Sequence, residues 1–135
     1  MGNLEAIRRA LDARPDVRLA YLFGSAARGE ERASSDLDIA VLFATLPDPR
    51  DLERLIAELQ GTGRLRVDLV VLNTAPPLLA HEVIARGRLL VCGDQDERVR
   101  FEVRAIARYL DTGHLRSVQH SYLRERAQAH RARSS

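Results

Sequence analysis

Three aspartates are spaced so that they could hold metal ions. Asp36 and Asp38 begin a predicted strand, residues 36–43, and residues two apart on a strand point to the same face of its sheet. Two ionised carboxylates so close together repel each other, and a divalent cation between them removes that repulsion. Asp68 lies among valines and leucines in another predicted strand, residues 65–72, where an unpaired carboxylate would be costly. If the two strands are neighbours, the three side chains form an oxygen-rich site that suits a pair of Mg²⁺ ions.

A glycine and a serine follow a third predicted strand, residues 19–23. Because Gly24 has no Cβ, the backbone there can approach a phosphate closely, and the Ser25 hydroxyl and nearby backbone N–H groups can donate to its oxygens. Arg28 lies close enough in the sequence to add charge-assisted hydrogen bonds. The pattern therefore predicts a phosphate-binding turn, with ten residues between Ser25 and Asp36.

Each of these residues also has an ordinary structural explanation. Asp36 and Asp38 could lie in a solvated loop that precedes a strand, and Asp68 could pair with Arg66. Arg28 could be a surface arginine, because acidic residues follow it closely. The joint spacing of the glycine, the serine and the aspartates favours the functional interpretation for the aspartates.

Hydrophobic patterning predicts the elements that must position these residues. Helical spacing and capping residues predict helices over residues 4–11, 49–60 and 76–86, and apolar runs predict strands over 19–23, 36–43, 65–72 and 89–92. A further helix begins at Asp96 and is broken at 111–113, and a last one begins near Leu115. We therefore expect one α/β (α+β) domain, a mixed sheet flanked by helices with two helices at the C-terminal end.

The predicted helix from Asp96 carries two apolar faces, and we expect a helix of this kind to be covered on both sides. The second face is covered by the last helix, or it is a docking surface for a partner. The first face consists of Val99, Val103, Ile106 and Leu110, and the second consists of Phe101, Ala105 and Tyr109.

Composition excludes several classes of protein. The chain has 135 residues, of which 45% are apolar and 30% are charged, as in a single globular domain. No apolar run approaches the roughly 20 residues of a membrane helix, and residues 1–14 lack the apolar core of a signal peptide, so we expect a cytoplasmic protein. All 21 basic residues are arginines, which excludes a phosphate-binding Walker lysine.

Charge is distributed unevenly along the chain. Residues 1–97 contain 12 arginines and 16 acidic residues, whereas residues 98–135 contain 9 arginines and 3 acidic residues, so the net charges are −4 and +6. The basic C-terminal third could meet an acidic protein surface, a nucleotide or RNA, and the sequence alone does not choose among them.

The glycine–serine pair, its spacing and the aspartates together resemble the motif of the polymerase-β-like nucleotidyltransferases. The fuller pattern, residues 24–29 followed by residues 35–38, is similar to the minimal branch of that superfamily, the MNT proteins. This branch includes antitoxins that are paired with HEPN-domain toxins. The resemblance covers nearly the whole chain, because a strand–helix core followed by arginine-rich helices such as residues 98–111 is also typical of the branch.

The resemblance implies a role for each matching position. It implies a polymerase-β-like nucleotidyltransferase domain over residues 1–135, with a catalytic core at 1–93 and C-terminal helices at 94–130. The arginine-rich, small-residue composition of residues 131–135 predicts a frayed tail. By this resemblance, Asp36 and Asp38 are metal ligands, and Asp68 is a third carboxylate that shares a metal ion and helps to deprotonate the attacking hydroxyl. The triphosphate-binding residues it implies are Gly24 and Ser25, with Arg28 and Ser35 as neighbours.

The reaction implied by the resemblance is the attack of a hydroxyl on the α-phosphate of ATP, with release of pyrophosphate and with Mg²⁺ as cofactor. In the antitoxin branch the hydroxyl belongs to a tyrosine of the HEPN toxin, a ribonuclease that AMP addition silences. Two alternatives remain open: an antitoxin that only binds and occludes the toxin, and an enzyme that modifies a small hydroxyl compound such as an aminoglycoside. We expect no membrane and no direct nucleic-acid binding, and a homo-oligomer stays open.

Overall fold

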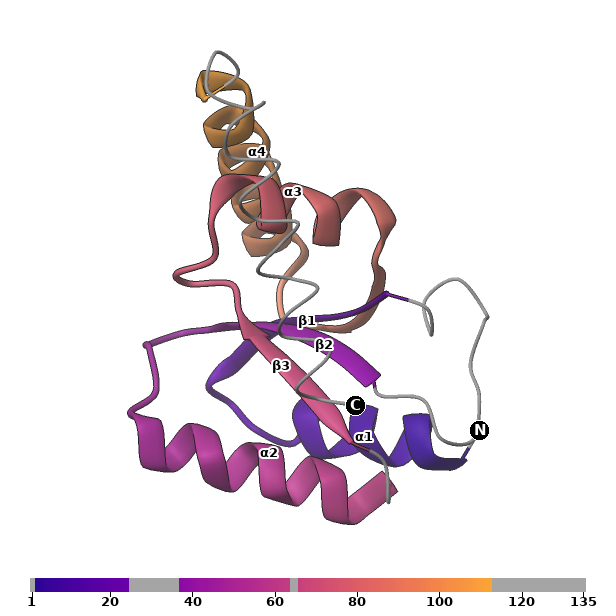
Figure 1. Cartoon of the computed structure of the whole chain (residues 1–135). Helices are drawn as coiled ribbons and strands as arrows, with labels where there is room; N and C mark the ends of the chain where they lie inside the picture. The colour runs from indigo at the N-terminus through magenta and orange to yellow at the C-terminus, as the bar shows by residue number, and fades with distance from the viewer. Residues whose placement is uncertain (1, 25–36, 64–65, 113–135) are drawn as a thin grey trace.

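Four helices and four strands make up the described residues, which are 2–24, 37–63 and 66–112 in a computed structural model of the chain (Figure 1). The predicted order of elements is confirmed within these ranges. The elements are α1 (Gly2–Asp12), β1 (Val17–Phe23), β2 (Leu37–Phe43), α2 (Pro49–Gly63), β3 (Val67–Val71), α3 (Pro77–Arg86), β4 (Arg88–Cys92) and α4 (Gln95–Asp111).

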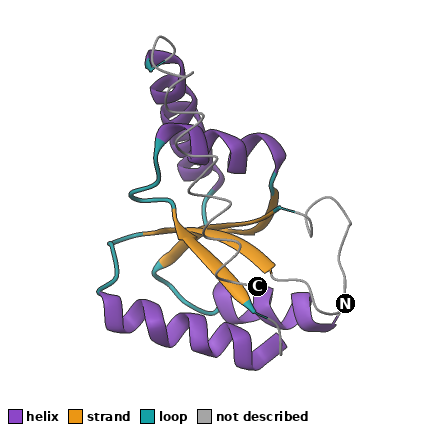
Figure 2. Ribbon diagram, viewed as in Figure 1, coloured by secondary structure: helices purple, strands orange, loops and turns teal. Residues whose placement is uncertain are grey.

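The strands form one mixed sheet in the order β3-β2-β1-β4, as Figure 2 shows in orange between the helices. β1 runs antiparallel to both β2 and β4, whereas β2 and β3 are parallel. A parallel pair needs a crossover connection, and α2 supplies it. The expected mixed sheet with flanking helices is therefore confirmed.

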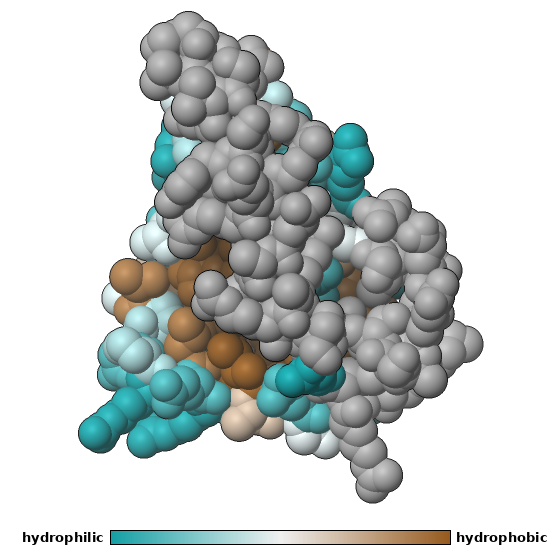
Figure 3. All heavy atoms as spheres, viewed as in Figure 1, coloured by the Kyte–Doolittle hydropathy of each residue, from teal (hydrophilic) through white to brown (hydrophobic). Residues whose placement is uncertain are grey.

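Two helices pack on each face of the sheet, with α1 and α2 below it and α3 and α4 above it in Figure 1. Side chains alternate between the two faces along each strand. On β2, Ile39 and Val41 join the core under α1 and α2, whereas Ala40 joins the core under α3 and α4. Figure 3 shows the hydrophilic outer surface of α2 in teal and apolar residues in brown above it.

Local capping explains where several helices begin and end. The Asp48 carboxylate accepts a hydrogen bond of 2.9 Å from the Asp51 N–H at the start of α2, and the Asp94 carboxylate accepts one of 3.0 Å from the Asp96 N–H at the start of α4. The predicted end of α2 before Gly61 is wrong, because the helix continues to Gly63. A glycine in a helix costs about 1 kcal/mol relative to alanine and does not by itself end the helix.

The prediction that α4 is covered on both sides is wrong for the described residues. The face with Val99 and Val103 is exposed, with exposed fractions between 40% at Ile106 and 61% at Leu110. Its other face packs on α3 and the sheet. On that face Ala105 is buried, Phe101 packs against the core, and the Tyr109 ring stacks on the His81 ring with centroids 3.9 Å apart.

The last helix predicted from Leu115 and the tail at 131–135 lie outside the described residues. Within the described ranges, no helix combines the length and the apolar character that a membrane crossing requires.

Candidate active site

Two of the three predicted carboxylates lie side by side on the sheet. In the parallel pairing of β2 with β3, Asp38 is the register partner of Asp68, and the two residues lie near the N-terminal ends of their strands. Neighbouring strands are about 4.8 Å apart. By strand alternation both side chains point to the sheet face that α3 and α4 cover, the face of Ala40. The two strands are therefore neighbours, as the predicted shared carboxylate site required.

Both carboxylates are largely removed from solvent. The exposed fraction is 9% for Asp38 and 7% for Asp68, and they are the two buried charged side chains among the described residues. Burying ionised groups costs several kcal/mol unless other charges or hydrogen bonds compensate it. Two carboxylates placed together in this way favour a cation between them.

The turn after β1 lies directly against one of these carboxylates. Gly24 has a φ of +77°, in the left-handed region that favours glycine. A Cβ at this position would lie 3.2 Å from Cγ of Asp38 and closer still to Oδ2. The absence of a side chain at Gly24 therefore leaves room for the Asp38 carboxylate, a role that the sequence analysis did not assign to it.

The other predicted site residues lie outside the described ranges. They are Asp36, Ser25, Arg28 and Ser35. Within the described residues, no cluster of three or more His, Cys, Asp or Glu side chains is placed to hold a metal ion. The described part of the site is thus the pair Asp38 and Asp68 beside Gly24.

A polar network ties α4 to the same face of the sheet. The Tyr21 hydroxyl donates a hydrogen bond of 2.7 Å to Oε2 of Glu102, and the Arg98 guanidinium donates one of 3.1 Å to the same oxygen. Burial and the hydrogen bond to Glu102 raise the pKa of Tyr21 well above its ordinary value. The hydrogen bond to Glu102 also raises the pKa of Arg98.

Sequence reasoning missed this network, although one signal was present. Tyr21 is the polar-tipped residue in an otherwise apolar buried strand, and a buried tyrosine hydroxyl usually has a hydrogen-bond partner. Because Tyr21 opposes Ala40 and Phe23 opposes Asp38, the network lies two residues along the sheet from the Asp38 carboxylate. It fixes α4 over the face on which the site opens.

Comparison with known proteins connects this geometry to one reaction class. The family described as "Polymerase beta, Nucleotidyltransferase" matches residues 5–96. The protein adenylyltransferase MntA of Shewanella oneidensis is 34% identical over 109 residues, which cover 81% of this chain and 78% of that protein.

Solved structures agree over a larger share of the chain. A toxin–antitoxin structure with AMP-PNP contains a chain with a TM-score of 0.72 and 33% identity, and the match covers 91% of this chain and 97% of that one. A chain of the Shewanella oneidensis complex between a tri-AMPylated HEPN toxin and an MNT antitoxin has a TM-score of 0.66 and 31% identity, with 91% and 94% covered.

Proposed function

Because the chain belongs to the polymerase β nucleotidyltransferase family, as a minimal nucleotidyltransferase of the MntA type, we propose that it is the antitoxin that transfers AMP from ATP to a HEPN toxin. The observation that carries this proposal is the parallel pairing of β2 with β3, which brings Asp38 and Asp68 together beside Gly24. A protein that only occluded a toxin would not need two buried carboxylates at one edge of its sheet.

The proposed Mg²⁺ ligands are Asp36, Asp38 and Asp68. The donor set fits this ion, since carboxylate oxygens are the ligands that Mg²⁺ prefers, and two of the three side chains share one face of neighbouring strands. When bound, Mg²⁺ would neutralise the triphosphate and polarise the α-phosphate.

The proposed triphosphate-binding residues are Gly24 and Ser25, with Arg28 and Ser35 beside them. The close approach of Gly24 to Asp38 supports this assignment, because it brings the turn and the carboxylates to one place. Backbone N–H groups at such a turn can donate to phosphate oxygens without competition from a side chain at Gly24. Arg28 would add a charge-assisted hydrogen bond.

The proposed reaction is a single displacement at phosphorus. A tyrosine hydroxyl of the toxin attacks the α-phosphate, a new O–P bond forms, and the bond from that phosphorus to the bridging oxygen breaks, so that pyrophosphate leaves. Asp68 accepts the proton of the attacking hydroxyl. The residues of this chain contribute positioning and electrostatics and form no covalent intermediate.

Intact-mass spectrometry tests the proposal. The proposed HEPN toxin partner is incubated with ATP, Mg²⁺ and the chain. We expect the toxin to gain mass in units of AMP with the wild type and with Asp12→Asn, an exposed carboxylate on α1 that serves as the control. The double variant Asp36→Asn/Asp38→Asn should fold and bind the toxin but transfer nothing.

Two other results would replace the proposal. If the double variant protected cells from the toxin as fully as the wild type does, protection would come from occlusion of the toxin and not from AMP transfer. If the wild type neither bound nor modified the toxin, a small hydroxyl compound such as an aminoglycoside would be the next acceptor to test.

A further inference from the structure

The helix α4 carries two rows of exposed side chains. One, the arginine row, consists of Arg100, Arg104 and Arg108, each four residues after the last and all exposed. The other, the apolar stripe, lies on the same helix with its centre about 130° around the axis from the arginine row, and Val103 and Arg100 are the nearest members of the two rows. The members of the stripe are between 40% and 61% exposed, and they are Val99, Val103, Ile106 and Leu110.

The positive charge of the arginine row is not balanced within the described part of the chain. None of its three guanidinium groups makes an ion pair with a described residue, whereas six other described arginines do. Like charges four residues apart on a helix repel each other. The repulsion would be relieved by carboxylates brought by another molecule.

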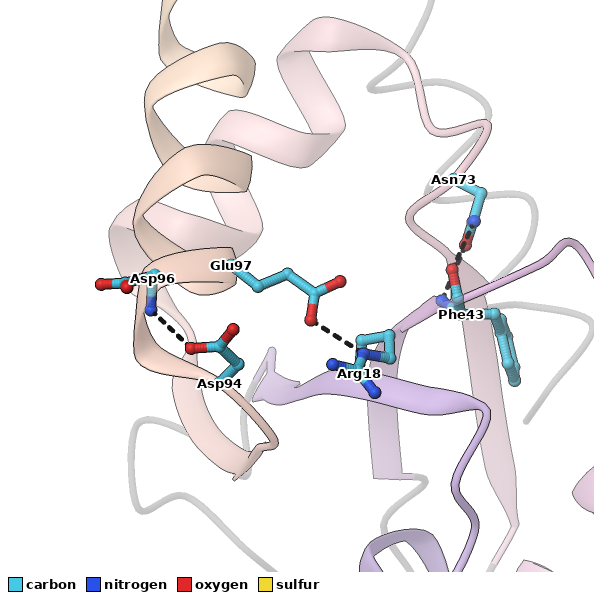
Figure 4. A network of polar contacts seen from close by, with 6 residues as sticks. All are labelled: Arg18, Phe43, Asn73, Asp94, Asp96 and Glu97. Atoms are coloured by element: carbon cyan, nitrogen blue, oxygen red, sulfur yellow. Dashed lines mark hydrogen bonds and ion pairs between the residues drawn. The ribbon is translucent and has the colours of Figure 1, made fainter.

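A pocket of about 280 Å³ lies where the arginine row meets the end of the sheet. The Asn73 side chain holds the rim of the pocket, because its amide makes two hydrogen bonds of 2.9 Å with the Phe43 backbone (Figure 4). In the same figure Arg18 of β1 and Glu97 of α4 point toward each other and form an ion pair of 2.8 Å. The Glu97 charge is therefore already compensated, and Arg100 and Arg104 make the pocket positive.

We propose that the pocket, the arginine row and the apolar stripe together are a docking surface for an acidic amphipathic segment of a protein partner. Carboxylates of that segment pair with Arg100 and Arg104 at the pocket, and its apolar side chains cover the stripe. That this partner is the HEPN toxin rests on the proposed function. The acidic and apolar character of the segment is inferred from the exposed arginines and aliphatic side chains of α4.

The apolar stripe favours a protein over a nucleic acid. Proteins that bind single strands combine basic groups with exposed aromatic platforms on which bases stack. The exposed large apolar residues of α4 are instead aliphatic, and its Tyr109 ring stacks on His81, whereas Phe101 is partly buried and lines the pocket beside Arg100 and Arg104. Aliphatic side chains gain from contact with the apolar core of a protein interface and not from contact with phosphates.

The position of the surface lets one partner reach both the docking surface and the active site. Leu42 lines the pocket and lies four residues after Asp38 on β2, about 13 Å along the strand. Residues an even number apart share a face, so the site and the pocket belong to the same face of the sheet. A standard interface covers about 800 Å² on each partner and is wide enough to include both. The docked segment thus holds the partner while its acceptor hydroxyl lies at the carboxylates.

Charge reversal on α4 tests the surface with the proposed HEPN toxin partner. The variant Arg100→Glu/Arg104→Glu changes two exposed residues, and Arg50→Glu/Arg54→Glu on α2 is a matched control with the same spacing and exposure. We expect the first variant to bind the toxin at least about tenfold more weakly, with its remaining affinity less sensitive to salt, and the control to bind as the wild type does. Equal affinities for the two variants would overturn the docking surface, as would a dimer of this chain that is formed through the stripe.

Two peptides and an RNA test the chemistry without the toxin, so that failure of the surface and failure of the proposed function can be told apart. The probes are an amphipathic leucine–glutamate helix, its leucine–lysine counterpart and an oligouridine of similar length. We expect fluorescence anisotropy to show binding of the glutamate peptide alone, with loss in Arg100→Glu/Arg104→Glu and in Val103→Asp. Binding of the oligouridine, or of both peptides equally, would overturn the proposal even if the wild type transfers AMP. If the wild type transfers no AMP but binds the glutamate peptide as expected, the proposed function fails and the surface stands.

Discussion

Replacing Gly24 by alanine should leave the chain folded and remove most of its transfer activity. The left-handed conformation at φ +77° costs an alanine about 1–2 kcal/mol. The new Cβ would lie 3.2 Å from Cγ of Asp38 and closer to Oδ2, so the carboxylate must rotate, which costs about 0.5–1.5 kcal/mol. Together these are about 1.5–3.5 kcal/mol, less than the roughly 5–15 kcal/mol that stabilises a native domain.

The effect on catalysis should be much larger than the effect on stability. A displacement of about 1 Å at a group that positions the reaction can cost about 100-fold in rate, and the rotation moves Asp38 itself. We therefore expect kcat for AMP transfer to fall by about 100-fold or more, as measured by toxin modification under saturating ATP and Mg²⁺. Thermal melts of the same samples report the fraction folded.

Gly61→Ala is the control for this prediction. Gly61 lies in α2 with nothing within 4 Å of its would-be Cβ, so alanine should raise stability by about 0.5–1 kcal/mol and leave transfer unchanged. The reasoning is refuted if Gly24→Ala is folded and its kcat is within about threefold of the wild type. It is also refuted if a crystal structure of the variant shows Asp38 in its original position.

Three further substitutions test the supporting structure. Tyr21→Phe removes the 2.7 Å hydrogen bond to Glu102 and should lower the free energy of unfolding by about 1–3 kcal/mol in urea denaturation. Since burial raises the pKa of Tyr21 above its ordinary value of about 10, the unfolded chain releases this proton first, and the wild type loses stability as the pH rises beyond about 10. The difference between wild type and Tyr21→Phe should therefore shrink there, and a constant difference would contradict the role of burial. Gly87→Ala brings a Cβ against the carbonyl oxygens of Val83 and Leu22. It should lower the free energy of unfolding by about 1–3 kcal/mol in thermal melts, while the folded fraction keeps its transfer activity. An unchanged melting temperature would show that the backbone shifts to accommodate the Cβ. Asp48→Ala removes the cap of α2 and should cost about 1 kcal/mol by the same measurement, whereas Asp48→Ser should restore most of it.

Local patterns were sufficient to predict most of the described elements and the pairing at the site. Residues on β2 and β3 had to alternate between faces, so Asp38 and Asp68 could be placed together once the strands were assumed to be neighbours. Whether the two strands are neighbours depends on contacts between segments 30 residues apart. The spacing of apolar residues within each segment does not predict such contacts. The resemblance to a known family supplied the roles of individual residues.

Helix α4 shows why the remaining features could not be predicted. Helical periodicity identified its two apolar faces, but the period is the same whether a face meets the sheet or the solvent. Ala105 and Phe101 pack against α3 and the sheet, whereas Val103 and Leu110 are exposed to solvent. The close approach of Gly24 to Asp38 depends on the backbone conformation of the turn after β1. A glycine can adopt that conformation, but the presence of a glycine in the sequence does not by itself predict it.

The central claim is that Asp38 and Asp68 form the centre at which AMP is transferred to the toxin. The most direct test incubates the HEPN toxin, Mg²⁺ and the chain with ATP labelled either in the α-phosphate or in the γ-phosphate. The account predicts that the wild type and Asp12→Asn transfer only the α-label, and that Asp38→Asn and Asp68→Asn, although folded, transfer none. Transfer of the γ-label, or undiminished transfer of the α-label by either strand variant, would contradict it.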